Sequence, residues 1–273
     1  MNRMIPDISK EKFCRSWSSA VPGFEKILAR IREAGFEDSP ECARINYNSG
    51  KTVWRCQTGG FDFAYKIQEG KKPWRYFFRS SLPVRECKNY RILAQLDIKV
   101  PDVLAVGDVR KFFKLKESFL VTSFLQGTRD GNIFRPGREF YRGAEELKRA
   151  FCEEAMRTIA AFHSKGYYHK AFHARNLLFR GENAAELELF WIDVARPRKN
   201  SLFFRKRHEI NDLHVFFRDM VLPRSEVLDL LKIYAAGRQD KKLSAEKLFN
   251  DIVKFRRRLI VNSRFMVFDE TND

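Results

Sequence analysis

The sequence predicts a two-lobed α+β fold, with a small β-rich N-terminal lobe and a larger helical C-terminal lobe. Short strand-like runs separated by turns fill the first half, whereas apolar residues at helical spacing fill the second half. The pattern changes after Gln126-Gly127, and the 273 residues are enough for two lobes. We therefore expect a helical N-terminal extension over residues 1–40, an N-terminal lobe over 41–125 and a C-terminal lobe over 126–273.

Turns and apolar spacing define the elements expected in the first half. Apolar residues at helical spacing between Phe24 and Ile31 predict a helix, and Gly35 follows as its stop. The turn at 48–51 and a later Gly-Gly pair predict hairpin connections. An amphipathic helix is expected at 84–96. The strands are expected at 43–48, 52–58, 61–68, 103–107 and 117–123.

The second half is expected to be mainly helical. Between residues 145 and 165, apolar residues such as Leu147, Phe151 and Ala155 recur at helical spacing. Further helices are expected at 208–220, 225–236 and 245–255.

The composition indicates a folded protein without a membrane-spanning segment. Hydrophobic residues make up 44% of the chain, which is ample material for a packed core. No run approaches the ~18 apolar residues of a membrane-spanning helix, and residues 1–10 lack the apolar segment of a secretory signal. We therefore expect a cytoplasmic protein. Its five cysteines are scattered without a C-x-x-C pair, so we expect reduced thiols rather than a disulfide framework or a zinc site.

The formal net charge of +17 predicts a polyanionic partner: nucleic acid, an anionic membrane face or a phosphorylated glycolipid. Basic residues are concentrated at 196–207 and 254–258, although each stretch alone can equally be a solvated surface. No recognised nucleic-acid-binding motif is present, so we do not expect nucleic acid as the partner.

Residues 169–176 read H-K-A-F-H-A-R-N and follow a long expected helix. Protein kinases carry H-R-D-L-x-x-x-N here, followed by a strand-end aspartate in D-F-G. His169 and Asn176 have this spacing, and Asp193 ends the second apolar strand after Asn176, but the first aspartate is replaced by Ala171. This order of residues predicts that the two lobes form a protein-kinase-like fold.

Asn176 and Asp193 are candidate ligands of a metal ion. Phosphoryl transfer requires cations that bridge the phosphates, and the hard oxygens of an amide and a carboxylate suit Mg²⁺. An isolated Asn and Asp would more often be turn residues, but the spacing and the flanking strands favour a metal site. We therefore expect Asp193 to be both a metal ligand and a catalytic group.

The first half supplies a candidate phosphate-binding lysine with an acidic partner. Lys66 lies in F-A-Y-K-I, a strand-like run similar to the V-A-I-K of kinases, and Glu86 lies on the next helix. Because an unpaired buried charge is costly, we expect Lys66 to pair with Glu86 and to act on the nucleotide phosphates as a catalytic group. The turn containing Gly50 would cover the phosphates, and the backbone from Ser123 to Leu125 would face the adenine.

Asp212 lies in the helix expected after the first basic stretch. It can anchor the backbone of the 169–176 loop, or it can be an ordinary acid near a helix N-terminus, where the helix dipole favours it. The sequence leaves both interpretations open.

Four segments resemble the Kdo/WaaP-type lipopolysaccharide kinases, which phosphorylate sugars of the lipopolysaccharide inner core. They lie at 83–96, 162–179, 192–198 and 205–217. The third reads I-D-V-A-R-P-R in place of D-F-G, and the fourth is a basic stretch that runs into D-L-x-V-F-F. The resemblance implies ATP and Mg²⁺ as cofactors, and transfer of the γ-phosphoryl group to a heptose or Kdo hydroxyl.

The resemblance also implies a lipid-linked acceptor at the cytoplasmic face of the inner membrane. This agrees with the basic charge, since both the acceptor and the membrane surface are anionic. The candidate acceptor-binding residues are Arg196, Arg198, Lys199 and Arg205. The sequence leaves open whether an acidic protein partner also uses this basic surface.

Ala171 is the departure from the family, which has aspartate here to accept or orient the proton of the acceptor hydroxyl. Alanine can do neither, so turnover should fall ~10²–10⁴-fold while nucleotide binding survives. The chain is either a naturally inactive pseudokinase that acts as a nucleotide-binding scaffold or an engineered inactive form. We favour the engineered form because Lys66, Glu86, Asn176 and Asp193 are all kept. A kinase-like phosphotransferase with a protein or small-molecule acceptor is the remaining alternative.

Overall fold

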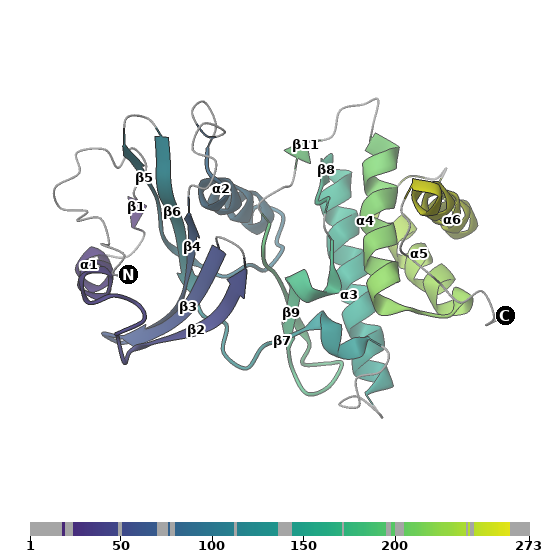
Figure 1. Cartoon of the computed structure of the whole chain (residues 1–273). Helices are drawn as coiled ribbons and strands as arrows, with labels where there is room; N and C mark the ends of the chain where they lie inside the picture. Colours follow the sequence, from purple (N-terminus) through teal and green to yellow (C-terminus); the bar gives the residue numbers. More distant parts are fainter. Residues whose placement is uncertain are drawn as a thin grey trace. The chain divides into compact units, whose positions relative to one another are not determined.

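The chain divides into two compact units in the computed structural model (Figure 1). The first unit is formed by Met1–Ile92 and Val100–Gln126, and the second by Leu93–Lys99 and Gly127–Asp273. The structure describes residues 18–19, 24–48, 51–69, 76, 80–111, 114–135, 144–170, 172–194, 198–199, 205–238, 240 and 243–262.

An antiparallel sheet forms the centre of the first unit. Its elements are β1 (Ser18–Ser19), α1 (Phe24–Ala34), β2 (Cys42–Asn48), β3 (Lys51–Thr58), β4 (Phe61–Glu69), α2 (Leu82–Ala94), β5 (Val103–Lys111) and β6 (Lys114–Ser123). The strands lie in the order β1-β5-β6-β4-β3-β2, so that β4 lies between β3 and β6. Gly59 and Gly60 connect β3 to β4 with φ angles of 58° and 81°, as a two-residue hairpin turn requires.

Helix α1 packs on this sheet with the apolar face that its spacing predicts. Phe24, Leu28 and Ile31 are buried in one core with inward-facing residues of β3, β4, β5 and β6. The helix is followed by Gly35, whose φ of 85° suits a glycine at a helix C-terminus. The described part of the N-terminal segment therefore belongs to the core of the first unit.

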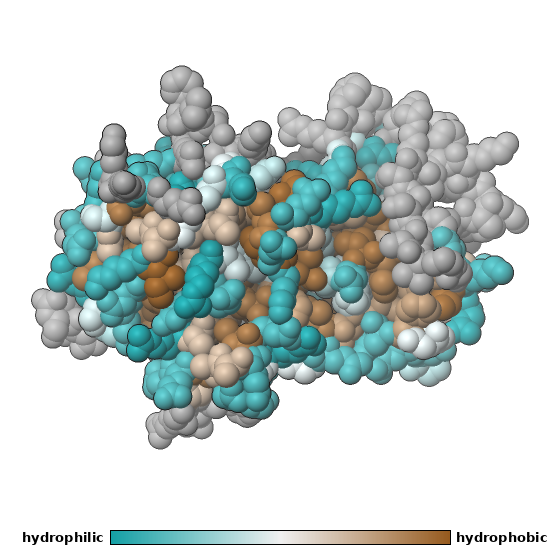
Figure 2. Space-filling model, turned by 180° about the vertical axis from the view of Figure 1, so that it is seen from behind, coloured by the Kyte–Doolittle hydropathy of each residue, from teal (hydrophilic) through white to brown (hydrophobic). Residues whose placement is uncertain are grey.

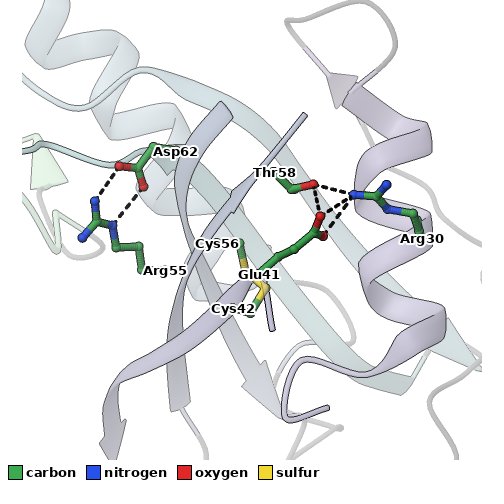
Figure 3. The surroundings of a disulfide bond; sticks show 7 residues. All are labelled: Arg30, Glu41, Cys42, Arg55, Cys56, Thr58 and Asp62. Carbon is green, nitrogen blue, oxygen red and sulfur yellow. Dashed lines mark hydrogen bonds and ion pairs between the residues drawn. A yellow bond between two sulfur atoms is a disulfide. The ribbon is translucent and has the colours of Figure 1, made fainter. Parts of the chain in front are cut away.

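The expectation of reduced thiols is wrong for one pair, because Cys42 and Cys56 form a disulfide between β2 and β3 (Figure 3). The two cysteines are 14 positions apart, but the antiparallel register places them opposite each other with Cα atoms 4.2 Å apart. Spacing along the chain does not reveal this proximity, since it depends on the register of the hairpin. Cys87 and Cys152 are free and buried, and burial raises the pKa of Cys152 to about 12. Cys14 lies outside the described residues.

Ion pairs lie on either side of the disulfide (Figure 3). Arg30 of α1 contacts Glu41 at 3.0 Å, and the Thr58 hydroxyl donates to the same carboxylate at 2.7 Å. Arg55 and Asp62 pair at 2.7 Å across β3 and β4. Because these side chains are partly exposed, the pairs orient the elements and add little to stability.

The second unit is mainly helical, as predicted. Its described elements are β7 (Arg129–Asp130), the 3₁₀ helix η2 (Gly131–Phe134), α3 (Glu145–Ser164), β8 (Tyr167–Tyr168), the 3₁₀ helix η4 (Ala174–Asn176), β9 (Leu177–Arg180), β10 (Glu188–Trp191), β11 (Arg198–Lys199), α4 (Arg205–Met220), α5 (Arg224–Arg238) and α6 (Ala245–Asn262). One small sheet has the order β10-β9-β7, and β11 pairs with β8. These short strands lie on either side of the 169–176 segment and hold its ends.

Buried aromatic rings fix the 169–176 segment within the second unit. Phe172 is fully buried, and its ring centroid lies 4.9 Å from that of Trp191 on β10 and 5.6 Å from that of Phe216 on α4. Trp191 also packs edge-on against Phe162 of α3 at 5.4 Å. The segment is thereby held against a strand and a helix by hydrophobic burial.

The surface combines polar and apolar residues. Hydrophilic residues are spread over the face seen in Figure 2, with apolar residues visible between them. Within the described residues, no helix combines the length and the apolar character needed to cross a membrane. The long helix α3, for example, carries Glu153, Glu154 and Arg157 in ion pairs near 3 Å.

The observed elements confirm the α+β fold class and most of the predicted boundaries. Every strand and helix predicted from the sequence begins within three residues of its expected start. β1 was not expected; its two serines pair with Ala105 and Val106 of β5. A two-residue strand is defined by its partner, so the local sequence carries little signal for it.

Candidate active site

The predicted ion pair between Lys66 and Glu86 is present in the first unit. Lys66 Nζ lies 2.8 Å from Oε2 and 3.2 Å from Oε1 of Glu86. Lys66 lies on β4 in the interior of the sheet, and Glu86 lies on α2. Glu86 is only 2% exposed, so the lysine offsets the desolvation of the carboxylate, and Tyr90 donates a further hydrogen bond at 2.9 Å. The contact gives the ammonium group a defined direction.

The segment from Ser123 to Leu125 follows β6 at the end of the first unit. The Ser123 amide donates to the Asp102 carbonyl at 2.8 Å, and the Phe124 amide donates to the Asp62 carbonyl at 3.0 Å. Two backbone donors of this segment are therefore used inside the unit. An adenine would have to contact other backbone groups of the same segment.

Asn176 and Asp193 end neighbouring segments of the second unit. Asn176 closes the 3₁₀ helix η4 and is 8% exposed, whereas Asp193 follows β10 and is exposed. The Ile192 amide donates to the Asn176 carbonyl at 2.9 Å, and Trp191 pairs with Leu177 in the strand register. Asp193 therefore directly follows the residue whose amide donates a hydrogen bond to Asn176. Its φ of 54° is a left-handed conformation that Asp tolerates better than most residues.

Asp212 anchors the backbone of the 169–176 loop, which confirms one of its two interpretations. Its Oδ2 accepts a hydrogen bond from the His169 amide at 2.6 Å and lies 3.3 Å from His163 Nε2. The other ring nitrogen of His163 lies 2.8 Å from the Tyr234 hydroxyl. Asp212 is fully buried in the middle of α4, so it is not an acid of the helix N-terminus.

Asp219 is a second anchor of the same loop, and sequence reasoning missed it. Its Oδ2 lies 2.9 Å from His173 Nδ1 and accepts a hydrogen bond from the Ala174 amide at 3.3 Å. Burial alone would raise the pKa of Asp219, but hydrogen bonds from His173 and Arg218 outweigh it, so the pKa is lowered. Asp219 lies seven residues after Asp212, which is two turns along the same face of a helix. That spacing was the available signal.

The residues that flank position 171 are held in defined conformations. Lys170 has a φ of 70°, an uncommon value for a non-glycine residue that is enriched at functional sites. Phe172 is buried, and burial lowers the pKa of His169, outweighing the nearby charges of Asp212 and Asp193. Neutral His169 thus serves as part of the packed support of the loop.

The strand pair β8–β11 brings two predicted acceptor-binding residues beside the start of the loop. Arg198 is opposite Tyr168 and Lys199 is opposite Tyr167 in the antiparallel register. The ring of Tyr168 stacks on that of His208 with centroids 4.0 Å apart and planes 7° apart.

The remaining predicted site residues are only partly covered by the structure. Arg205 is the first residue of α4. Gly50, Ala171 and Arg196 lie outside the described residues.

The donor set formed by Asn176 and Asp193 fits Mg²⁺. Among the described residues, no three His, Cys, Asp or Glu side chains gather as a larger metal site. Mg²⁺ in kinases does not require one, since it takes one or two protein oxygens and completes its shell with phosphates and water. The amide of Asn176 and the carboxylate of Asp193 are oxygen donors of that kind.

A sequence model of the Lipopolysaccharide kinase (Kdo/WaaP) family matches residues 66–234 of the chain. The chain belongs to this family. The matched region begins at Lys66 and includes Glu86, Asn176, Asp193 and Asp212. Membership of the Kdo/WaaP family confirms the predicted resemblance and makes the chain a lipopolysaccharide kinase by descent, that is, a phosphotransferase.

A solved structure described as WaaP in complex with acyl carrier protein is similar to this Kdo/WaaP family member. The two chains are 18% identical with a TM-score of 0.64, and the match covers 90% of this chain and 97% of the other. At this level of identity the match shows the fold, and it confirms the predicted kinase-like fold. No curated protein matches the chain.

Proposed function

We propose that this chain represents an ATP-dependent kinase that phosphorylates a heptose or Kdo hydroxyl of the lipopolysaccharide inner core, and that the form with Ala171 is inactive. The observation that carries the proposal is the 2.8 Å ion pair between Lys66 and Glu86. A lysine held this way on an interior strand is the phosphate-binding cation of kinase-like enzymes. Its position at the start of the region that matches the family supports the same role here.

Asn176 and Asp193 would hold Mg²⁺ in this proposal. The bound ion supplies positive charge to the phosphates of ATP. Asn176 presents its amide from a packed 3₁₀ helix, and the exposed Asp193 is accessible to a metal–nucleotide complex. The two anchors from α4 to the loop, Asp212 and Asp219, would keep these ligands in place.

The residue at position 171 would accept the proton of the attacking sugar hydroxyl. A methyl group has no proton acceptor, so Ala171 should leave nucleotide binding in place and remove most of the turnover. The loss expected for one general base is ~10²–10⁴-fold.

The first experiment restores the carboxylate with Ala171→Asp, and Ala171→Asn is the control of similar size that cannot accept the proton. Both are assayed for phosphoryl transfer from ATP to a core lipopolysaccharide that lacks phosphate on its core sugars. We expect the rate of phosphoryl transfer by Ala171→Asp to exceed the rates of the unmodified chain and of Ala171→Asn by at least ~10²-fold. A restored variant that phosphorylates neither heptose nor Kdo would contradict the proposal.

A second experiment concerns the metal ligands. Asp193→Asn should weaken binding of Mg·ATP because it removes the negative charge, and it should leave the folded state intact because Asn tolerates the left-handed backbone at this exposed position. Unchanged Mg·ATP binding in this variant would show that Asp193 is not a metal ligand.

The acceptor would be bound by Arg198 and Lys199 on β11, together with Arg196 and Arg205. The net charge of +17 supports an acceptor that lies in an anionic membrane surface, and we place the enzyme at the cytoplasmic face of the inner membrane. The same charge supports an acidic protein partner. The WaaP structure was solved with acyl carrier protein. Acyl carrier protein is therefore the first partner to test, by titrating it into the chain at low and at high salt.

The alternative function is a nucleotide-binding scaffold without turnover. It predicts that Mg·ATP binds to the chain as written and that Ala171→Asp adds no transfer to any sugar. Transfer to a protein or a small molecule by the restored variant would instead identify a kinase-like phosphotransferase with another acceptor.

A further inference from the structure

A pocket of about 320 Å³ lies beside the 169–176 loop, on the side of η2 and of the C-terminal end of α4. Three arginines line it: Arg135 after η2, Arg175 in η4 and Arg218 on α4. The proposed catalytic groups do not include any of the three. All of the lining residues belong to the second unit.

The pocket carries an excess of positive charge. Asp219 is its acidic residue, and its carboxylate is already engaged by His173 at 2.9 Å, by the Ala174 amide and by Arg218 at 3.1 Å. Within the part of the chain that the structure describes, Arg135 and Arg175 make no ion pair. Among the described residues, no carboxylate therefore neutralises two of the three guanidinium groups.

Val221 gives a second and independent observation at the same place. It follows the last residue of α4 with a φ of 49°, where a glycine is usual and a β-branched residue is strained. It is also 53% exposed, which makes it one of the two large apolar residues most open to solvent in the described chain. Strained backbone positions are enriched at active sites and ligand clamps, and Val221 lines this charged pocket.

The charge and shape of the pocket select a phosphate group. A guanidinium binds phosphate oxygens through two parallel hydrogen bonds, and two unneutralised guanidinium groups match a group that carries −1.5 to −2 charges. A carboxylate, with one charge, would leave one of the two cations unmatched. The volume of about 320 Å³ is larger than a phosphate needs and leaves room for part of the sugar that carries it, with Val221 as the apolar wall.

We propose that this pocket binds a phosphate monoester that the acceptor glycolipid already carries when it reaches the enzyme. Arg175 immediately precedes the proposed metal ligand Asn176. An acceptor held by its phosphate in this pocket would therefore lie along the 169–176 loop. The enzyme would therefore prefer an acceptor that an earlier phosphorylating reaction has modified. The identity of the acceptor rests on the proposed function, whereas the phosphate site does not.

The phosphate site is tested on the chain as written, by calorimetric titration with inorganic phosphate at constant ionic strength. Arg135→Gln and Arg175→Gln each remove one of the unneutralised cations, and Arg149→Gln removes the same charge from α3, outside the pocket. We expect the Kd for phosphate to rise about tenfold in each pocket variant and to stay unchanged in Arg149→Gln. Arg175→Lys should be intermediate, because it keeps the charge and loses the second hydrogen bond. Unchanged phosphate binding in both pocket variants, or acetate binding as tightly as phosphate, would overturn the site.

The source of the phosphate is tested with two acceptors in detergent micelles. One lacks phosphate only on its core sugars, and the other has been fully dephosphorylated. We expect the chain to bind the first about tenfold more tightly, and Arg135→Gln to abolish this difference. Equal affinity for both acceptors would show that the pocket takes free phosphate and would overturn the acceptor part of the inference. Binding of neither acceptor, with phosphate binding still sensitive to Arg135→Gln, would contradict the proposed function while leaving the phosphate site established.

Discussion

The Lys66–Glu86 pair places a carboxylate almost entirely out of solvent, next to a lysine whose side chain is 21% exposed. Lys66→Met should therefore destabilise the fold as well as weaken nucleotide binding, because among the described residues Glu86 would keep one hydrogen bond, from Tyr90. We expect a loss of about 1–3 kcal/mol in the free energy of unfolding, measured by urea titration at pH 7. Lys232→Met, which breaks the exposed pair with Asp229, is the control and should leave the midpoint almost unchanged. Equal effects of the two substitutions would contradict a buried role for Glu86.

His214 makes the stability of α4 dependent on pH. Burial and the neighbouring charges of Arg218 and Arg256 lower the pKa of His214 to about 4. In the unfolded chain the pKa of histidine is about 6.5, so between pH 6.5 and pH 4 the unfolded state binds a proton that the folded state does not. The stability that depends on neutral His214 is fully present above pH 6.5 and is lost as the pH falls toward 4.

Unfolding of the chain and of His214→Leu should therefore be compared at pH 7 and pH 4.5. From pH 7 to pH 4.5, we expect the free energy of unfolding of the unmodified chain to fall by up to about 3 kcal/mol more than that of the variant. Screening by solvent near the ring makes the difference smaller than this upper value. An identical pH response in both proteins would show that His214 is not the group responsible.

At the scale of single residues, the sequence predicts those whose order and spacing form a motif. Lys66 and Glu86 were paired correctly because a charge in an apolar strand requires a partner. The roles of Asn176 and Asp193 in metal binding stay predictions. The pocket that contains Arg135 and Arg218 was not predicted, because its residues come from three separate segments and these two arginines belong to no motif.

The hairpin β2–β3 is closed by the disulfide near its base, with Asn48 and Lys51 paired at its tip. A closed loop of this length stabilises a fold by about 3 kcal/mol, mainly by restricting the unfolded chain. Treatment with dithiothreitol should lower the free energy of unfolding by this amount, measured by urea titration of the oxidised and reduced forms. Cys42→Ser is the control and should not respond to the reductant. The difference between the two forms is the stability that the fold would lose in a reducing compartment, where most thiols stay reduced.

At the scale of elements, hydrophobic periodicity predicted the long helices and the main strands. The short strands β1, β7, β8 and β11 were not predicted, because each consists of two residues and exists through its partner. The disulfide was missed for the same reason, since the register that brings Cys42 to Cys56 is a property of the paired strands. Local sequence therefore specifies the elements, and pairing specifies the contacts between them.

The net charge of +17 acts at the scale of the whole molecule. We expect the chain to sediment with vesicles that contain phosphatidylglycerol and not with vesicles of phosphatidylcholine alone. Binding should weaken strongly between about 0.1 M and 1 M salt, because the screening length falls from about 10 Å to 3 Å. Binding to both vesicle types alike, or binding insensitive to salt, would indicate hydrophobic insertion instead of electrostatic attraction.

The central position of β4 in the sheet has a consequence for the synthesis of the protein. β4 ends at Glu69, and its second neighbour β6 begins at Lys114, about 45 residues later. At ~5–20 residues per second, a ribosome needs roughly 2–9 s to deliver that partner. During this interval the strand that carries Lys66 has one open edge on the nascent chain. A chaperone that binds extended segments would have its target there until β6 has been made and has paired with β4.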